Sequence, residues 1–134
     1  MLSTQGLMKS YGNQKILADV ILDLEKGEII SVVGSSGSGK TTLLRLISGL
    51  EKPDSGQIIL NNKVLNGGNT FTPPEKRDCS LVFQDYALFP NMSVQQNIYF
   101  GKNSVDNKKN IEQLIQITGI ANIMEKYPHQ CSGG

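Results

Sequence analysis

The sequence predicts an α/β fold, with a core of parallel strands and helices and a smaller antiparallel β subdomain at the N-terminus. The apolar run at residues 28–33 and the helical spacing of leucines after residues 34–39 predict the core. The alternation of apolar and acidic side chains at residues 18–25 predicts the antiparallel part. A chain of 134 residues can bury one ordinary core, so we expect one α/β domain.

The first elements are expected to be antiparallel strands. Residues 7–11 should form a strand that ends at the turn signal Gly12-Asn13. The next strand should be half-buried, because its apolar side chains recur at every second position. Its expected inward-facing residues are Ala18, Val20, Leu22 and Leu24. Lys26-Gly27 should then form the turn into the next strand.

The core is expected to begin with a buried parallel strand at residues 28–33, which are rich in β-branched side chains. A helix should follow the glycine-rich residues and stop at Gly49. One face of this helix is expected to carry Leu43, Leu46, Ile47 and Leu50. Further strands are expected at residues 57–60 and 79–83, with an exposed loop at residues 66–69 between them.

Two helices are expected in the last part of the chain. Ser93 and Gln96 have the spacing of a capping box and predict a short helix through Phe100. A later amphipathic helix should present one apolar face, formed by Ile111, Leu114, Ile115 and Thr118. No internal repeat is visible, and no linker divides the chain into independent domains.

Composition limits the classes of function. Thirteen basic and twelve acidic residues nearly cancel, which argues against a nucleic-acid footprint or a polybasic membrane patch. No apolar stretch approaches the length of a membrane span, and residues 1–5 lack the features of a signal peptide. Cys79 and Cys131 are too few for a disulfide framework, so the cytosol is the expected compartment.

Residues 34–42, Gly-Ser-Ser-Gly-Ser-Gly-Lys-Thr-Thr, match the phosphate-binding pattern G-x-x-x-x-G-K-[ST]. Glycines allow close backbone approach, so the loop amides and the start of the following helix can point at phosphate oxygens. Lys40 would place a positive charge at the β- and γ-phosphates, and the Thr41 hydroxyl would ligate Mg²⁺. A flexible Gly/Ser linker is the alternative, but Lys40 and the tight apolar flanks argue against it.

Further motifs follow in a fixed order. Tyr11 precedes the loop, Gln84 ends the run Val-Phe-Gln, and residues 131–134 are Cys-Ser-Gly-Gly. With these motifs the chain resembles the ATP-binding subunits of ABC transporters essentially from end to end, with Cys131 where that family usually has leucine. Gln84 matches the Q-loop of this family, and residues 86–98 resemble the segment that follows the Q-loop in bacterial importers. The expected core is therefore a P-loop NTPase core, truncated at the signature motif.

The resemblance implies roles for single residues. Tyr11 would stack on adenine, Lys40 and Gln84 would take part in catalysis, and Thr41 and Gln84 would bind Mg²⁺. The alternative for Tyr11 is a hairpin aromatic that covers the small sheet, and the alternative for Gln84 is a polar residue that ends a strand. The residues expected to contact ATP are Tyr11, Gly34, Ser35, Ser36, Gly37, Ser38, Gly39, Lys40, Thr41, Thr42, Ser132, Gly133 and Gly134.

The resemblance also implies partners. Ser132, Gly133 and Gly134 would contact ATP held by a second ATP-binding subunit, in a head-to-tail homodimer with composite sites. The segment from Tyr86 to Phe100 would dock on transmembrane permease subunits, with a plain amphipathic core segment as the alternative. The protein would then be cytoplasmic and peripheral, on the inner face of the bacterial plasma membrane.

The resemblance implies that residues 1–134 are the N-terminal part of an ABC-type ATP-binding domain. The Walker A motif, which is the phosphate-binding pattern at residues 34–42, and the Q-loop are present. The Walker B strand, the D-loop and the switch histidine are absent. The whole protein would be an ATPase that drives solute import, and the 134-residue chain alone is expected to be inactive. In the family, strands from the absent part pair with the strand before the phosphate loop. Their absence should therefore leave open strand edges and uncovered apolar surface here.

Other functions are carried as alternatives. A non-catalytic nucleotide-binding or interaction module would bind ATP without turnover. An ABC-type ATPase of translation or DNA repair is disfavoured by the near-neutral charge, and a P-loop kinase by the lack of a phosphoacceptor site and a basic lid. Among importers, residues 73–77 with 82–90 are similar to the group serving ferric iron, polyamines, sulfate and sugars, and ferric iron is the expected solute.

Overall fold

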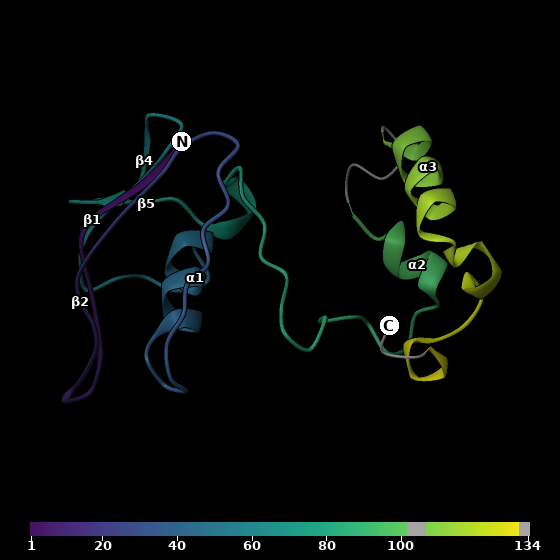
Figure 1. The fold of residues 1–134 in the computed structure, drawn as a ribbon, viewed down its shortest axis with the longest axis horizontal. Coiled ribbons are helices and arrows are strands. Elements are labelled where there is room, and N and C mark those ends of the chain that lie inside the picture. The colour runs from purple at the N-terminus through teal and green to yellow at the C-terminus, as the bar shows by residue number, and fades with distance from the viewer. Residues whose placement is uncertain (102–106, 132–134) are drawn as a thin grey trace. The chain divides into compact units, whose positions relative to one another are not determined.

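The structure is a computed structural model that describes residues 1–101 and 107–131. The chain divides into two compact units, Met1–Leu81 and Val82–Gly134, and each is described by itself (Figure 1). The composition of the sequence does not mark this division. Within the described residues, no helix has both the length and the apolar character needed to cross a membrane.

The first unit contains a five-stranded antiparallel sheet in the order β2-β1-β3-β4-β5. Its strands are β1 (Leu2–Tyr11), β2 (Gln14–Leu24), β3 (Ser55–Leu60), β4 (Lys63–Gly67) and β5 (Thr70–Phe71). The predicted antiparallel subdomain and its turn at residues 12–13 are confirmed. The predicted loop at residues 66–69 is wrong at its start, because Asn66 is buried in β4 and the turn begins at Gly68.

Strand β2 departs from simple alternation because it contains a bulge. Leu7 pairs with Val20, and Lys9 pairs with Leu17. Two steps along β1 therefore correspond to three steps along β2. The extra residue lies beside Asp19, whose φ is 57°. Because the bulge changes which side chains face inward, Leu17 is buried and Ala18, predicted to face inward, is exposed.

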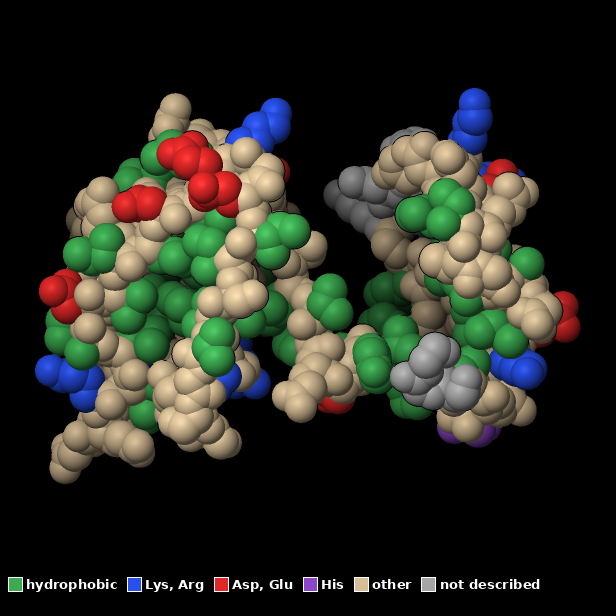
Figure 2. Space-filling view, viewed as in Figure 1, with side chains coloured by type: hydrophobic (Ala, Val, Ile, Leu, Met, Phe, Trp, Pro, Cys, Tyr) green, Lys and Arg blue, Asp and Glu red, His purple; other side chains and the backbone are tan. Residues whose placement is uncertain are grey.

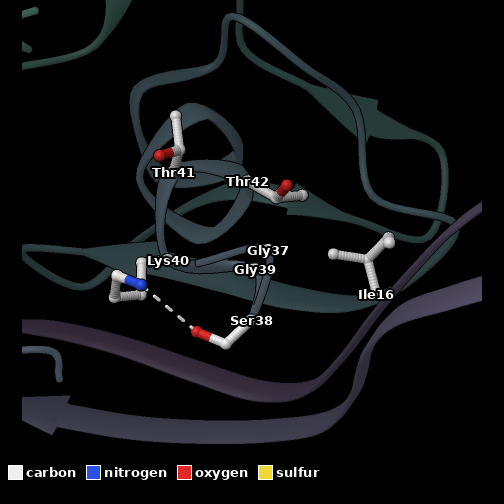
Figure 3. Close-up of a pocket in the computed structure, with 7 residues that line it drawn as sticks. All are labelled: Ile16, Gly37, Ser38, Gly39, Lys40, Thr41 and Thr42. Carbon is white, nitrogen blue, oxygen red and sulfur yellow. Dashed lines mark hydrogen bonds between the residues drawn. The ribbon is translucent and has the colours of Figure 1, made fainter. Parts of the chain in front are cut away.

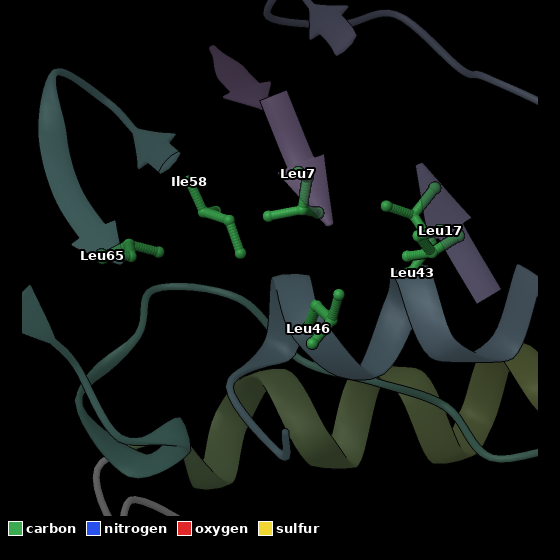
Figure 4. Packing of buried hydrophobic residues seen from close by; sticks show 6 residues of the cluster. All are labelled: Leu7, Leu17, Leu43, Leu46, Ile58 and Leu65. Atoms are coloured by element: carbon green, nitrogen blue, oxygen red, sulfur yellow. The ribbon is translucent and has the colours of Figure 1, made fainter. Parts of the chain in front are cut away.

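The core of the first unit lies between the sheet and helix α1 (Lys40–Ser48), as Figure 4 shows. Leu43 and Leu46 of α1 are buried, which confirms the predicted helix face at these positions, whereas Leu50 lies beyond the helix and is exposed. Burying one such side chain contributes about 1.5–3 kcal/mol. The core residues are Leu7, Leu17, Leu43, Leu46, Ile58 and Leu65.

Glycines mark both ends of α1. Gly39 precedes the helix with φ of 90°, and Gly49 follows it with φ of 81°, which confirms the predicted stop. The Gly49 N–H donates to the carbonyl of Leu46 at 3.2 Å. A Cβ at Gly49 would collide with the guanidinium of Arg77, which comes from the segment after the 3-10 turn η1 (Pro74–Lys76).

The two segments predicted to be buried strands are not strands in this structure. Residues 28–33 and 79–83 have no regular secondary structure, and Ile29, Val33 and Val82 are 95%, 90% and 85% exposed. A parallel strand takes its hydrogen bonds from neighbouring strands, and among the described residues neither segment pairs with one. Cys79, predicted to be buried in its strand, is half-buried. Figure 2 shows hydrophobic side chains at the surface of the first unit.

The second unit is helical. It contains α2 (Val94–Ile98), α3 (Lys108–Thr118) and the 3-10 turns η2 (Ile120–Ile123) and η3 (Pro128–Gln130). The capping box is confirmed, since Gln96 N–H donates to Ser93 Oγ at 3.2 Å and Ser93 N–H donates to Gln96 Oε1 at 2.8 Å; the helix ends at Ile98 rather than Phe100. The predicted face of α3 lines an apolar hollow of about 280 Å³ with Ile98 and Ile120.

Candidate functional site

The glycine-rich residues form a tight loop directly before α1. Gly37 and Gly39 have φ of 80° and 90°, values that side chains with a Cβ rarely adopt. Ser38 N–H donates to the Ser35 carbonyl at 3.2 Å, and Leu43 N–H donates to the Gly39 carbonyl at 2.8 Å, which starts the helix. No side chain caps the first turn, so its N–H groups are available to an anion.

The loop is fitted against β2. A Cβ on Gly39 would lie 2.8 Å from Leu17 Cδ2 and 3.1 Å from the backbone oxygen of Ile16. A Cβ on Gly34 would lie 2.6 Å from Ser38 Oγ. Packing and backbone angle therefore both favour glycine at position 39, whereas at position 34 only the contact with the Ser38 side chain does. The buried Leu17 joins the loop to the core.

Lys40 folds back over the loop (Figure 3). Its Nζ donates to the carbonyl of Gly34 at 2.8 Å, to the carbonyl of Ser35 at 2.7 Å and to Ser38 Oγ at 3.3 Å. All three acceptors are neutral oxygens, so none of these contacts pairs the positive charge of Lys40 with a carboxylate. The ammonium is therefore ready to exchange these acceptors for phosphate oxygens.

A hollow of about 240 Å³ lies against the loop, and its lining is drawn in Figure 3. A second hollow, of about 270 Å³, touches Gly34, Ser38, Gly39 and Lys40. Ser35 and Ser36 line neither hollow, although both belong to the predicted loop. The residues that line the first hollow are Ile16, Gly37, Ser38, Gly39, Lys40, Thr41 and Thr42.

Tyr11 lies at the end of β1 and is 47% exposed. Its hydroxyl donates to Glu51 Oε2 at 2.6 Å. This hydrogen bond raises the pKa of the Tyr11 phenol, partial burial adds to the rise, and the side chain of Thr42 acts in the opposite direction. Tyr11 therefore interacts with the side chain of Thr42, and Thr42 lines the first hollow, so Tyr11 lies beside the loop.

The other predicted site residues lie in the second unit or outside the described residues. Gln84 is exposed and opens a turn at residues 84–87, where Tyr86 and Ala87 both have positive φ, 61° and 47°. The predicted contacts Ser132, Gly133 and Gly134 lie outside the described residues.

The predicted docking segment exposes large apolar side chains, among them Tyr86, Leu88 and Phe89 at 65%, 52% and 43% exposure. Asn97 of α2 organises the chain beside them. Its Oδ1 accepts from the Phe89 N–H at 2.8 Å, and its Nδ2 donates to carbonyls of Phe89, Met92 and Ser93 at 3.0–3.1 Å. The Phe89 and Phe100 rings pack with centroids 4.5 Å apart.

Sequence reasoning did not find three residues that shape these sites. Ile16 lines the first hollow, Glu51 holds Tyr11, and Asn97 fixes residues 89–93. Ile16 and Glu51 reach the site from elements distant in sequence, and no short pattern marks them. The Asn97 contacts are local, and an asparagine four residues after the N-cap Ser93 was the available signal.

A glycine loop at a helix N-terminus, with a lysine folded over it, defines a P-loop nucleotide-binding protein. The particular family follows from comparison with known proteins. Residues 17–134 match the ABC transporter family, and the chain therefore belongs to it. The predicted resemblance to ABC transporter ATP-binding subunits is confirmed.

Two curated relatives show the subgroup that the chain is similar to. The Fe(3+) ions import ATP-binding protein FbpC 2 of Haemophilus influenzae is 41% identical over 140 residues, which cover 100% of this chain and 39% of the relative. The spermidine/putrescine import ATP-binding protein PotA of Nitrosospira multiformis is 41% identical over 139 residues, covering 100% of this chain and 37% of the relative. The chain thus spans about two fifths of the length of these relatives.

Solved structures confirm the fold. The structure of cbiO1 from Clostridium perfringens, part of the ABC transporter complex cbiONQ, superposes with a TM-score of 0.76 at 27% identity, covering 98% of this chain and 55% of that one. The dimeric structure of the bacterial ABC transporter cassette MJ0796 gives 0.76 at 23% identity, covering 99% and 64%. The predicted α/β class of a P-loop ATPase cassette is therefore confirmed, although the described sheet is antiparallel.

Proposed function

We propose that this chain binds Mg-ATP at residues 34–42 and that the whole protein hydrolyses ATP to drive solute import. The observation that carries the proposal is Lys40, which lies folded over the loop and is held by neutral oxygens at 2.7, 2.8 and 3.3 Å. Membership of the ABC transporter family and 41% identity to two import ATP-binding proteins support the same function.

The residues of the loop fit a triphosphate. The first turn of α1 has uncapped amides, and the positive-φ glycines Gly37 and Gly39 bring backbone close to the hollow. Lys40 would donate to phosphate oxygens, and the exposed hydroxyl of Thr41 would hold Mg²⁺. ATP supplies the phosphoanhydride bond that is broken, and the loop binds and orients it. Tyr11 would provide the stacking surface for adenine.

The proposal includes two kinds of partner. A second ATP-binding subunit would face the first head to tail and contact its ATP through Ser132, Gly133 and Gly134. The dimeric ABC cassette among the structural neighbours supports this arrangement. Transmembrane permease subunits would contact the segment from Tyr86 to Phe100, which exposes aromatic and apolar side chains. The protein would then lie on the cytoplasmic face of the membrane.

We propose ferric iron as the transported solute. The relatives named above are import proteins for Fe(3+) and for spermidine and putrescine, at the same 41% identity, so an uptake measurement must separate the two. Deleting the gene in its host should abolish ferric iron uptake and leave polyamine uptake intact. The reverse pattern would overturn the choice of solute without affecting ATP binding.

Calorimetric titration of the 134-residue chain with Mg-ATP tests the binding step, with Lys40→Ala as the variant. We expect heat of binding in the wild type and its loss in Lys40→Ala. Lys76→Ala is a matched control, because Lys76 is an exposed lysine away from the loop. Binding that survives in Lys40→Ala would overturn the assignment of the site to this loop.

A further inference from the structure

Four side chains form a polar cluster beside the loop, and the proposed function does not use three of them. Tyr11 donates to Glu51 Oε2 at 2.6 Å, and the other carboxylate oxygen of Glu51 lies 3.3 Å from Lys9 Nζ. Lys9 Nζ also lies 3.4 Å from Asp54 Oδ1. Glu51 and Asp54 belong to the connection between α1 and β3, whereas Lys9 and Tyr11 belong to β1.

The cluster is anchored to the backbone on both sides. Asp54 Oδ2 accepts from the Ser10 N–H at 2.7 Å, and Lys9 Nζ donates to the Lys52 carbonyl at 2.9 Å. The Asp54 N–H donates to the Met8 carbonyl at 3.0 Å. The end of β1 is therefore tied to the segment that follows α1, and the Glu51 carboxylate has a fixed direction.

Each group in the cluster has a defined place relative to the Tyr11 ring. Lys9 Nζ lies 5.5 Å from the ring centroid, and Glu51 holds the hydroxyl at the far end of the ring. The side chains of Lys9 and Glu51 are only 14% and 20% exposed, although Tyr11 itself is 47% exposed. The Lys9 ammonium thus lies over one face of the Tyr11 ring and Glu51 holds the hydroxyl, while nearly half of the Tyr11 surface remains exposed to a ligand.

Partial burial alone would lower the pKa of Lys9, but hydrogen bonds and charge from Glu51 and Asp54 outweigh it and raise this pKa. The Tyr11 phenol is likewise kept protonated by Glu51. In each contact of the cluster a donor, the Lys9 ammonium or the Tyr11 hydroxyl, meets an oxygen of Glu51 or Asp54.

We infer that Glu51 is a positioning residue for nucleotide binding, which fixes the Tyr11 ring for stacking on the base of ATP. This inference rests on the proposed function of the loop. A tyrosine side chain at the end of a hairpin loses rotamer freedom when it stacks, and a hydrogen bond that orders it beforehand removes part of this cost. Glu51 acts through Tyr11 and has no contact with the ligand of its own.

The test compares two ligands of the same loop. Mg-ATP carries phosphates and a base, whereas Mg-tripolyphosphate carries phosphates alone. Removing the acceptor in Glu51→Ala should weaken Mg-ATP binding about three- to tenfold, the factor that one hydrogen bond is worth, and leave Mg-tripolyphosphate binding unchanged. Glu51→Gln keeps an acceptor for the Tyr11 hydroxyl and should bind Mg-ATP close to wild type. Glu75→Ala is the matched control, because Glu75 is exposed and lies in η1.

Tyr11→Phe provides a second route that keeps the ring and removes its hydroxyl. It should weaken Mg-ATP binding as much as Glu51→Ala, and the double variant should be no weaker than either single variant. Unchanged Mg-ATP binding in Glu51→Ala would overturn the positioning role while the loop assignment stands. Equal losses for both ligands would also overturn it, because Glu51 would then support the loop itself. A wild type that binds neither ligand would overturn the proposed function and this inference together.

Discussion

Replacing Arg77 by alanine should strongly destabilise the first unit. Only 6% of the Arg77 side chain is exposed, and its guanidinium lies across the C-terminal end of α1. Nη1 donates to the carbonyls of Leu46 and Ile47 at 2.8 and 2.7 Å, and Nε donates to the carbonyl of Thr72 at 2.7 Å. The first two acceptors belong to the last turn of the helix, where the regular helical hydrogen bonds end. The Leu46 carbonyl also accepts from the Gly49 N–H at 3.2 Å, and the Ile47 carbonyl accepts weakly from Cys79 Sγ at 3.8 Å.

The magnitude follows from these contacts. Each intramolecular hydrogen bond contributes about 0.5–1.5 kcal/mol net, and a buried acceptor left without a donor costs about 1–3 kcal/mol. Burial of the guanidinium opposes this gain, because desolvation lowers the pKa of Arg77. Balancing the lost bonds against the charge that need no longer be buried, we expect Arg77→Ala to reduce the free energy of unfolding by about 2–4 kcal/mol.

Urea unfolding of the chain, followed by circular dichroism, measures this loss. Lys76→Ala is the control, because Lys76 is an exposed neighbour in η1 and should change the free energy of unfolding by less than about 0.5 kcal/mol. Arg77→Lys keeps the charge but cannot span the same carbonyls, so it should be nearly as destabilising as Arg77→Ala. An unchanged unfolding midpoint in Arg77→Ala would show that Arg77 does not stabilise α1.

Two further predictions concern charge and exposed apolar surface. The pKa values of Tyr11 and Lys9 are raised above their ordinary 10.0 and 10.5, so their contribution to stability is present below these values and is lost as pH rises through the raised ones. Melting temperatures of wild type and Glu51→Ala should therefore converge at alkaline pH, and a constant difference would contradict this. The exposed Ile29, Val33 and Val82 predict that the chain self-associates with rising concentration; sedimentation showing only monomer would disprove it.

Local signals in the sequence predicted the elements that are fixed by local interactions. The glycine stop of α1, the capping box before α2 and the turn between β1 and β2 depend on residues within a few positions of one another. The loop at residues 34–42 belongs to this group, since its pattern specifies its own backbone. These features were predicted at the correct residues.

The errors concern structure that depends on distant partners. An apolar run such as residues 28–33 predicts a buried strand only if other strands flank it, and among the described residues none does. The alternation in β2 predicted Ala18 as inward-facing, but the bulge beside Asp19 comes from pairing with β1, which the pattern of one strand does not contain. Glu51 was missed for the same reason, because its contact with Tyr11 spans 40 positions.

Helix α1 has a length set from outside the helix. Its first residue follows a glycine whose Cβ position is filled by Leu17 and Ile16, and its last residue precedes a glycine whose Cβ position is filled by Arg77. A side chain in place of either flanking glycine would displace a residue of another element. Any movement of α1 during nucleotide binding would therefore be a rotation or translation of the whole helix. A shift at the Lys40 end would be carried to Arg77 at the other end without being absorbed by a change of helix register.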